Sequence, residues 1–213
     1  MTVAVKICGL KDKAAVAAAV SGGAGFVGFV FFARSPRFIR PEAAGALGAA
    51  VPKKIVKVGL VVDADDDALE AIIAGAKIDM LQLHGTETPE RATAIRARFG
   101  LPVMKALAVA TPADIDKAAA FEPAVDRFLF DAKPPKGATR PGGNAGTFDW
   151  TLLKGRAFAK PWLLAGGLTA ANLARAVAQS GAAGVDVSSG VEDAPGVKSP
   201  EKILGFLRVA KTL

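Results

Sequence analysis

Short runs of apolar and β-branched residues alternate eight times with alanine-rich stretches of helical character along this chain. The predicted strands cover residues 3–7, 26–31, 54–62, 79–83, 103–107, 125–130, 162–165 and 184–187. Most of the predicted connections have about 2 to 6 residues, which is typical of α/β units. Because consecutive parallel strands need a crossover helix between them, this alternation predicts a parallel sheet.

Several helices carry recognisable start signals. The predicted helices cover residues 12–20, 63–74, 89–99, 170–179 and 200–209, with further ones opening at Pro41, at Thr111-Pro112 and near Asp149. Proline is favoured in the first helical turn, and carboxylates there interact well with the helix dipole. Eight strand–helix units predict a closed (β/α)₈ TIM barrel formed by one domain, residues 1–213, although about 250 residues is usual. An open doubly wound sheet is the alternative, but no GxGxxG follows the first strand.

Other features of the sequence exclude several classes of protein. Apolar runs such as residues 26–33 are far shorter than the ~20 residues of a membrane span, and no signal-peptide core follows the start. We therefore expect a cytoplasmic protein with no membrane partner. One Cys and one His exclude an intramolecular disulfide and a zinc site built from several such ligands.

The charge balance is basic, with 27 Lys and Arg against 20 Asp and Glu. The basic residues are scattered, and Lys53-Lys54 is the only adjacent pair, whereas nucleic-acid binding usually needs a basic stripe or cluster. We expect no nucleic-acid partner. Attraction of small anions such as phosphate or carboxylate accounts for the surplus equally well.

In a barrel of this kind the chemistry lies at the C-terminal ends of the strands. Side chains alternate faces along a strand, so Lys6 shares a face with Cys8, and Gln82 shares one with His84. Their apolar neighbours Val5, Ile7, Leu81 and Leu83 should then face the helices. We therefore expect the four polar side chains to line the mouth of the barrel.

Cys8 is a candidate base or nucleophile. A lone intracellular cysteine is commonly a small buried hydrophobe, but Lys6 on the same face would favour its thiolate electrostatically. Asp131 is a candidate proton donor, since a carboxylic acid at a strand end can protonate a leaving oxygen. Capping a turn, or pairing with Lys133, is the structural alternative for Asp131.

Glycines and serines in the last two loops suggest a phosphate site. Gly166, Gly167 and Gly190 precede helical stretches, and Ser188 and Ser189 lie beside Gly190. In barrels the loops after strands 7 and 8 commonly bind phosphate through backbone N–H groups. Ordinary turn glycines are the alternative interpretation.

Arg37 and His84 also follow strands, and their roles are open. Arg37 suits a bidentate contact with a carboxylate, although a solvated loop arginine explains it as well. His84 suits a hydrogen-bonding, positioning role. A Ser188–His84–Asp186 triad is disfavoured because no GxSxG elbow accompanies it.

Several segments resemble phosphoribosylanthranilate isomerases, a (β/α)₈ family of tryptophan biosynthesis. They are KICG (6–9), GFVFFARSPR (28–37), QLHG (82–85), GGNAGTFDW (142–150), LAGGL (164–168) and GVDVSSGVE (184–192). Each is weak alone, but their combination and order are specific. The resemblance implies an Amadori rearrangement of N-(5-phospho-β-D-ribosyl)anthranilate into 1-(2-carboxyphenylamino)-1-deoxy-D-ribulose 5-phosphate, with no cofactor or metal.

Residue roles follow from the resemblance. It implies that Asp131 is the acid and Cys8 the base, and that Arg37 holds the anthranilate carboxylate. The phosphate would lie against the backbone around Gly166, Gly167, Ser189 and Gly190. We expect His84, Asp186 and Ser188 among the substrate-binding residues as well. The partner is then a small phosphosugar, and we expect a monomer, with a homodimer as the alternative.

The chain departs from the family pattern at three places. Gly142-Gly143-Asn144-Ala145 replaces the usual GG[ST]G, while Gly25 and Ser199 stand where aspartate is common.

Two other interpretations of the function remain open. One is a different phosphosugar barrel, such as an indole-glycerol-phosphate synthase or a pentose-phosphate epimerase. The other is a non-catalytic phosphate binder, for which Cys8 and Asp131 would have no use.

Strand alternation leads to one further hypothesis. Lys6 and Asp186 should both face the barrel interior near its mouth, where they would form a charge pair beneath Cys8. Replacement of Lys6 should then raise the pKa of the thiol.

Overall fold

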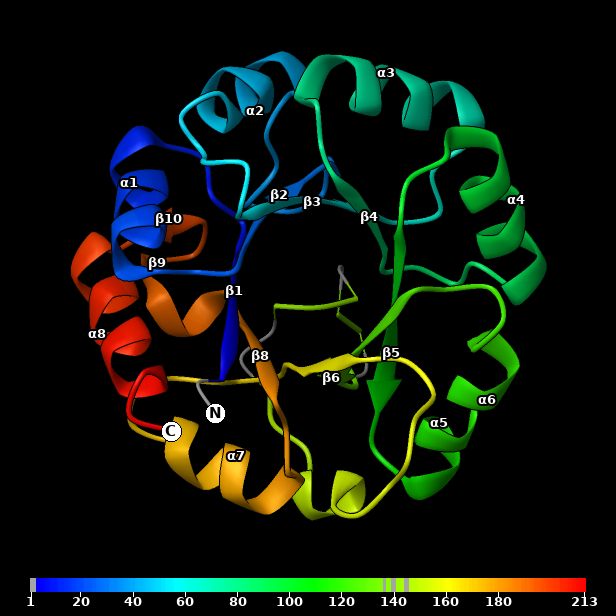
Figure 1. Ribbon diagram of the computed structural model, residues 1–213, viewed down its shortest axis with the longest axis vertical. Coiled ribbons are helices and arrows are strands. Elements are labelled where there is room, and N and C mark those ends of the chain that lie inside the picture. The colour runs from blue at the N-terminus through cyan, green and yellow to red at the C-terminus, as the bar shows by residue number, and fades with distance from the viewer. Residues whose placement is uncertain (1–2, 136, 139–140, 144–145) are drawn as a thin grey trace.

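The computed structural model describes residues 3–135, 137–138, 141–143 and 146–213. Eight parallel strands close into a barrel in chain order, with β1 paired to both β2 and β8 (Figure 1). The strands are β1 (Ala4–Cys8), β2 (Phe26–Val30), β3 (Val56–Val61), β4 (Met80–Leu83), β5 (Val103–Val109), β6 (Arg127–Ala132), β7 (Trp162–Leu164) and β8 (Gly184–Val187). The predicted (β/α)₈ architecture is confirmed, and the open sheet is excluded.

Helices form a ring around the barrel (Figure 1). They are α1 (Lys13–Gly22), α2 (Pro41–Gly48), α3 (Asp66–Ala76), α4 (Pro89–Phe99), α5 (Pro112–Asp116), α6 (Ala118–Phe121), α7 (Leu173–Ser180) and α8 (Pro200–Ala210). Side-chain caps define several starts: Asp12 accepts from the N–H of Ala15, and Asp65 from that of Ala68, each at 2.8 Å. Such caps satisfy backbone donors that the first helical turn leaves free.

Apolar side chains pack on both sides of the strands. Val5, Ile7, Leu81 and Leu83 belong to the buried layer between strands and helices, as the alternation predicted. A separate cluster fills the lower barrel interior and consists of Phe26, Val58, Met80, Met104, Ala106, Leu129, Leu163 and Ala165. At the C-terminal ends of the strands a third, smaller apolar cluster of Cys8, Val30 and Leu60 lies beside polar side chains, and a cavity opens between them.

The sequence placed some element boundaries incorrectly. β6 extends through Asp131 to Ala132, because β5 is longer than predicted and Ala108 and Val109 pair with these two residues. The helix expected near Asp149 is a four-residue 3₁₀ helix, η1 (Trp150–Leu153). After β8 the chain forms a second 3₁₀ helix, η2 (Ser189–Val191), and an unpredicted antiparallel hairpin, β9 (Glu192–Ala194) and β10 (Val197–Lys198).

Candidate active site

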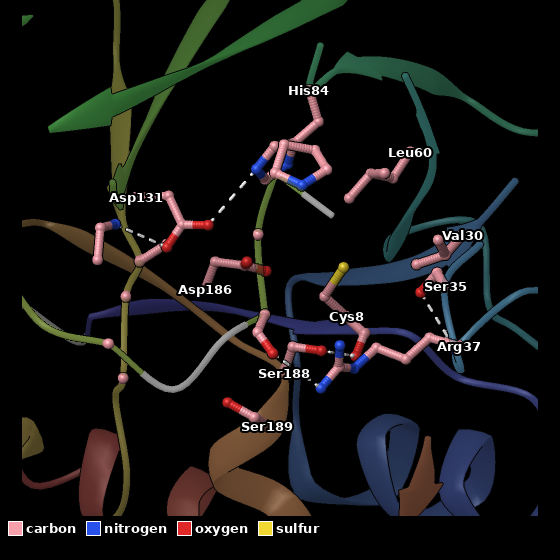
Figure 2. Close-up of a pocket in the computed structure, with 18 of the residues that line it drawn as sticks. Cys8, Val30, Ser35, Arg37, Leu60, His84, Asp131, Asp186, Ser188 and Ser189 are labelled. Carbon is pink, nitrogen blue, oxygen red and sulfur yellow. Dashed lines mark hydrogen bonds and ion pairs between the residues drawn. The ribbon is translucent and has the colours of Figure 1, made fainter. Parts of the chain in front are cut away.

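A cavity of about 780 Å³, counting the solvent space at its mouth, lies at the C-terminal ends of the barrel strands. The predicted site residues Cys8, Arg37, His84, Asp131, Gly166, Gly167, Asp186, Ser188 and Ser189 all line it (Figure 2). Gly190 does not line the cavity. Segments separated by up to 180 residues in sequence therefore meet at one site, as the barrel requires.

Cys8 ends β1 and is 4% exposed. Burial raises the pKa of its thiol above the ordinary value, and the positive charge of Lys6 opposes that rise. Gly28 on β2 provides the space for both side chains, since a Cβ there would lie 3.1 Å from Cys8 Sγ and from Lys6 Nζ. The thiol is thus held against an ammonium group within a narrow space.

Lys6 is fully buried, and its Nζ lies 2.8 Å from Oδ1 of Asp186. Burial by itself would lower the pKa of Lys6, but the charges and hydrogen bonds of Asp186 and Cys8 outweigh it, so that pKa lies above its ordinary value. Lys6 therefore stays protonated. The hypothesis of a charge pair beneath Cys8 is confirmed.

Asp131 lies within β6 and is 8% exposed. Its Oδ1 accepts a hydrogen bond from the N–H of Ala132 at 2.8 Å, and its Oδ2 lies 3.4 Å from His84 Nε2. Within the described residues the carboxylate faces His84 and forms no ion pair with Lys133. Figure 2 shows Asp131 and Cys8 approaching the cavity from different strands.

His84 connects Asp131 to the barrel interior. Its Nδ1 lies 2.9 Å from Nε2 of Gln82, which is fully buried. A neutral imidazole that accepts at Nδ1 from the Gln82 amide carries its ring proton on Nε2, toward Asp131. Oε1 of Gln82 has no hydrogen-bond partner in the described part of the chain.

Arg37 is 4% exposed and forms a two-point contact with Glu192. Its Nε lies 2.8 Å from Oε1 and its Nη2 2.8 Å from Oε2. Nη2 also donates to the carbonyl oxygen of Gly143 at 3.3 Å. Arg37 thus lines the cavity, as predicted for a residue that contacts the substrate. The alternative, a loop arginine exposed to solvent, is wrong because the side chain is buried.

The loops after β7 and β8 form one wall of the cavity. Gly166 and Gly167 have positive φ of 90° and 60°, a region that L side chains rarely adopt. Asn172 holds the first loop by donating to the carbonyl oxygen of Gly167 at 2.9 Å. In the second loop Oγ of Ser188 donates to the carbonyl oxygen of Cys8 at 3.1 Å, which ties this wall to β1.

Gly190 contributes to this wall from behind. It lies in η2, and a Cβ there would overlap the carbonyl oxygen of Leu168. The absence of a side chain therefore allows the loops after β7 and β8 to pack against each other. The predicted contact of phosphate with the backbone around Gly190 stays a prediction, and the structure adds this packing role.

Comparison with known proteins identifies the family. The family model for N-(5'-phosphoribosyl)anthranilate isomerase matches residues 5–209. The N-(5'-phosphoribosyl)anthranilate isomerase of Rhodospirillum centenum is 56% identical over 214 residues and covers 100% of both chains. This chain belongs to the phosphoribosylanthranilate isomerase family. It is an enzyme, an isomerase of tryptophan biosynthesis.

Solved structures of phosphoribosylanthranilate isomerases agree with the fold. The enzyme from Thermotoga maritima has a TM-score of 0.88 and 34% identity, covering 99% of this chain and 100% of that one. A second structure has a TM-score of 0.84, 31% identity and the same coverage. That protein holds reduced 1-(o-carboxyphenylamino)-1-deoxyribulose 5-phosphate.

The departures from the pattern of phosphoribosylanthranilate isomerases leave the described site intact. Gly25 takes part in the sheet through its backbone, donating to Val5 O and accepting from Val56 N. Ser199 caps α8 and accepts from the N–H of Lys202 at 3.4 Å, which is a role that serine and aspartate share. Asn144 and Ala145 lie outside the described residues.

Sequence reasoning missed two residues of the site, Glu192 and Lys198. Nζ of Lys198 lies 2.7 Å from Oε1 of Glu192, and both side chains are almost completely buried. Glu192 ends the matching segment GVDVSSGVE, so the motif itself contained a signal. Among the described residues no group of three His, Cys, Asp or Glu side chains is placed to hold a metal ion, and no helix is long and apolar enough to cross a membrane.

Proposed function

We propose that Cys8 and Asp131 carry out the isomerisation as base and acid on N-(5-phospho-β-D-ribosyl)anthranilate. The observation that carries this assignment is their common cavity, whose walls also contain Arg37 and the glycines of the loop after β7. A buried thiol beside a protonated lysine and a carboxyl group beside a histidine provide two proton-transfer groups.

In the first step Asp131 donates a proton to the furanose ring oxygen. The C1–O bond breaks as the anthranilate nitrogen lone pair forms a C=N bond, which opens the ring into a protonated Schiff base. The thiolate of Cys8 then removes the proton from C2. The electron pair of that C–H bond forms the C1–C2 double bond while the C=N electron pair returns to nitrogen, which gives a neutral enolamine. The enolamine tautomerises to the ketone, 1-(2-carboxyphenylamino)-1-deoxy-D-ribulose 5-phosphate.

The remaining residues hold the two ends of the substrate. Arg37 binds the anthranilate carboxylate, and His84 orients Asp131. Backbone N–H groups around Gly166, Gly167, Ser189 and Gly190 receive the phosphate. Ser188 also contacts the substrate, and Gly190 in addition keeps the two loops together. Asp186 keeps Lys6 in place below the thiol and faces the sugar hydroxyl groups. None of these steps needs a cofactor or a metal.

We propose in addition that the chain acts in the cytoplasm as one domain, residues 1–213, without a nucleic-acid partner. A monomer is the proposed state and a homodimer the alternative, since one solved relative from Thermotoga maritima is described as monomers made from a dimeric enzyme. Sedimentation equilibrium over a hundredfold range of protein concentration distinguishes the two states.

Fluorescence-monitored turnover of phosphoribosylanthranilate tests the catalytic assignment. We expect Cys8→Ala and Asp131→Asn each to lower kcat by about 10²–10⁴-fold, the usual contribution of a general acid or base. Both variants should still bind the reduced product analogue within a few-fold of the wild type. Full activity in Cys8→Ala would place the base elsewhere, and full activity in Asp131→Asn would do the same for the acid.

A further inference from the structure

We propose that Glu192, together with Lys198, positions Arg37 and helps to set the specificity of the enzyme. Glu192 fixes the orientation of the Arg37 guanidinium, and the three charges together give a net charge that suits a substrate bearing one aromatic carboxylate. This inference rests on the proposed role of Arg37. It concerns a buried three-charge cluster, Arg37–Glu192–Lys198, beside the cavity. The cluster is built by the unpredicted hairpin β9–β10.

Glu192 holds Arg37 at two points. Nε and Nη2 of Arg37 each lie 2.8 Å from a different carboxylate oxygen of Glu192. The two side chains are only 5% and 4% exposed, so water competes little for these contacts. A fork-to-fork contact of this kind fixes the plane of the guanidinium as well as its distance. Glu192 engages Nε and one hydrogen of Nη2, and the carbonyl oxygen of Gly143 accepts the other Nη2 hydrogen, so among the described contacts the Nη1 side is the one left for an incoming carboxylate.

Lys198 completes the cluster from the second strand of the hairpin. Its Nζ lies 2.7 Å from Oε1 of Glu192 and donates to the carbonyl oxygen of Ser188 at 2.8 Å. Its side chain is 1% exposed. Backbone pairing sets this arrangement, since Lys198 pairs with Glu192 in the hairpin and Ser199 N–H donates to Val191 O at 2.9 Å. Lys198 is thus held by backbone and by side-chain contacts.

The charges of the cluster leave one positive charge unbalanced. Arg37 and Lys198 contribute two positive charges and Glu192 one negative charge, which gives a net charge of +1. Burial would raise the pKa of Glu192, but Arg37 and Lys198 outweigh it and hold that pKa below its ordinary value, so Glu192 stays ionised. A single substrate carboxylate then neutralises the cluster, whereas a neutral aromatic amine leaves its charge uncompensated in a poorly solvated place.

The same cluster reaches the proposed base. Lys198 contacts Ser188, whose Oγ donates to the carbonyl oxygen of Cys8 at 3.1 Å. The group that receives the anthranilate end of the substrate is thereby connected to the end of β1. Glu192 itself is not among the residues that line the cavity. It therefore acts through Arg37 and is a positioning residue.

The test compares two ligands that differ in one group. The first is the reduced product analogue with its carboxyphenylamino group, and the second is the same compound made from aniline, which lacks the carboxylate. Dissociation constants are measured for the wild type, Glu192→Gln and Arg37→Gln. Glu192→Gln adds a positive charge to the cluster but removes the two-point contact that fixes the guanidinium plane. We expect the loss of orientation to dominate, with about a tenfold loss of affinity for the first ligand, or about 1.4 kcal/mol, and less than a twofold change for the second.

The outcomes separate the inference from the proposed function. Equal weakening of both ligands by Glu192→Gln would show a merely structural role and overturn the inference, as would no weakening of either. If Arg37→Gln weakens both ligands equally, the assigned role of Arg37 fails. Selective weakening by Arg37→Gln without any by Glu192→Gln would leave that role in place and overturn only the inference.

Two further variants are measured, one as a matched control and one in case Glu192→Gln does not fold. Asp193→Asn removes the neighbouring carboxylate, which is exposed and paired with Lys202 at 2.8 Å, and it should change neither dissociation constant. If Glu192→Gln fails to fold, Lys198→Met supplies a second measurement, because it keeps the Arg37–Glu192 contact and lowers the net charge of the cluster from +1 to 0. We expect it to weaken the carboxylate ligand selectively, and equal effects on both ligands would contradict the proposal.

Discussion

Lys6 and Asp186 form a buried ion pair, Nζ to Oδ1 2.8 Å, between the two strands that close the barrel, and the pair lies beside the thiol of Cys8. Their Cα atoms are direct partners in the β1–β8 ladder. The contact therefore joins the first strand to the last while it places an ammonium group next to the proposed base. One interaction thus serves barrel closure and thiol electrostatics together.

Lys6→Met should raise the pKa of the Cys8 thiol further above its ordinary value. Burial already raises that pKa, and Lys6 provides the largest opposing effect, so its removal leaves burial and the Asp186 charge to act together. Cys8 is the only cysteine of the chain, so the pH dependence of alkylation reports on a single thiol. The alkylation profile should move to higher pH, and an unchanged profile would contradict the prediction.

The double variant Lys6→Met/Asp186→Asn is the control for this measurement. Removal of Lys6 alone leaves a buried, unpaired carboxylate, which typically costs about 3–5 kcal/mol of stability. The double variant should regain part of that stability. Its thiol pKa should still exceed that of the wild type, since the effect of Lys6 on the thiol is larger than that of Asp186.

Gly190→Ala should weaken phosphate binding. The added methyl group would overlap the carbonyl oxygen of Leu168, so the loop after β8 must move away from the loop after β7. We expect affinity for inorganic phosphate to fall about tenfold, the equivalent of about 1.4 kcal/mol, as measured by competition with the reduced product analogue. Gly205→Ala is the matched control, because nothing lies within 4 Å of a Cβ there. It should stabilise α8 by about 1 kcal/mol and leave phosphate affinity unchanged.

Gln82→Met should lower kcat without loss of stability. The variant removes the amide that contacts Nδ1 of His84, so the ring loses its restraint toward Asp131. It also removes a buried oxygen that has no partner among the described residues, which ordinarily costs about 1–3 kcal/mol. Urea unfolding should show equal or greater stability, while turnover falls about tenfold or more. A destabilised variant with full kcat would contradict both parts.

Asp114→Asn should remove a pH-dependent part of the stability. The hydrogen bond from Lys117 and those from Ala110 and Thr111 hold the pKa of Asp114 far below its ordinary value. A carboxylate with a lowered folded-state pKa stabilises the fold above its unfolded pKa of about 3.9 and loses that effect as pH falls toward the folded value. Urea unfolding at pH 7 should show the variant about 1 kcal/mol less stable.

The same comparison at lower pH checks the direction in which the stability difference changes with pH. Between pH 7 and about pH 4 the difference between wild type and Asp114→Asn should stay constant, and it should shrink as pH falls further. A difference that grows on acidification would contradict the assignment. The other carboxylates of the chain are present in both proteins, so their titration cancels in the comparison. Asn cannot ionise, so the remaining pH dependence of the difference belongs to Asp114.

Local patterns predicted much of the fold because they depend on neighbouring residues. The period-two alternation around Cys8 and His84 correctly divided β1 and β4 into an interior and a helix-facing side. The expectation that Lys6 and Gln82 line the mouth was wrong, because both are fully buried and neither lines the cavity. It also predicted the Lys6–Asp186 pair, since two interior side chains at the same height on adjacent strands must meet. The end of β6 was misplaced, because its last pairs with Ala108 and Val109 depend on the length of β5.

By itself, the sequence determined the eightfold alternation, the family motifs and the identities of the candidate acid and base. Only the tertiary structure decided that Arg37 meets Glu192, because the two lie 155 positions apart and come together through barrel closure and the β9–β10 hairpin. It likewise placed His84 against Asp131 and moved Gly190 behind the cavity wall. Secondary structure follows from short-range periodicity, whereas ion pairs and glycine packing depend on distances between atoms that only the closed barrel brings together.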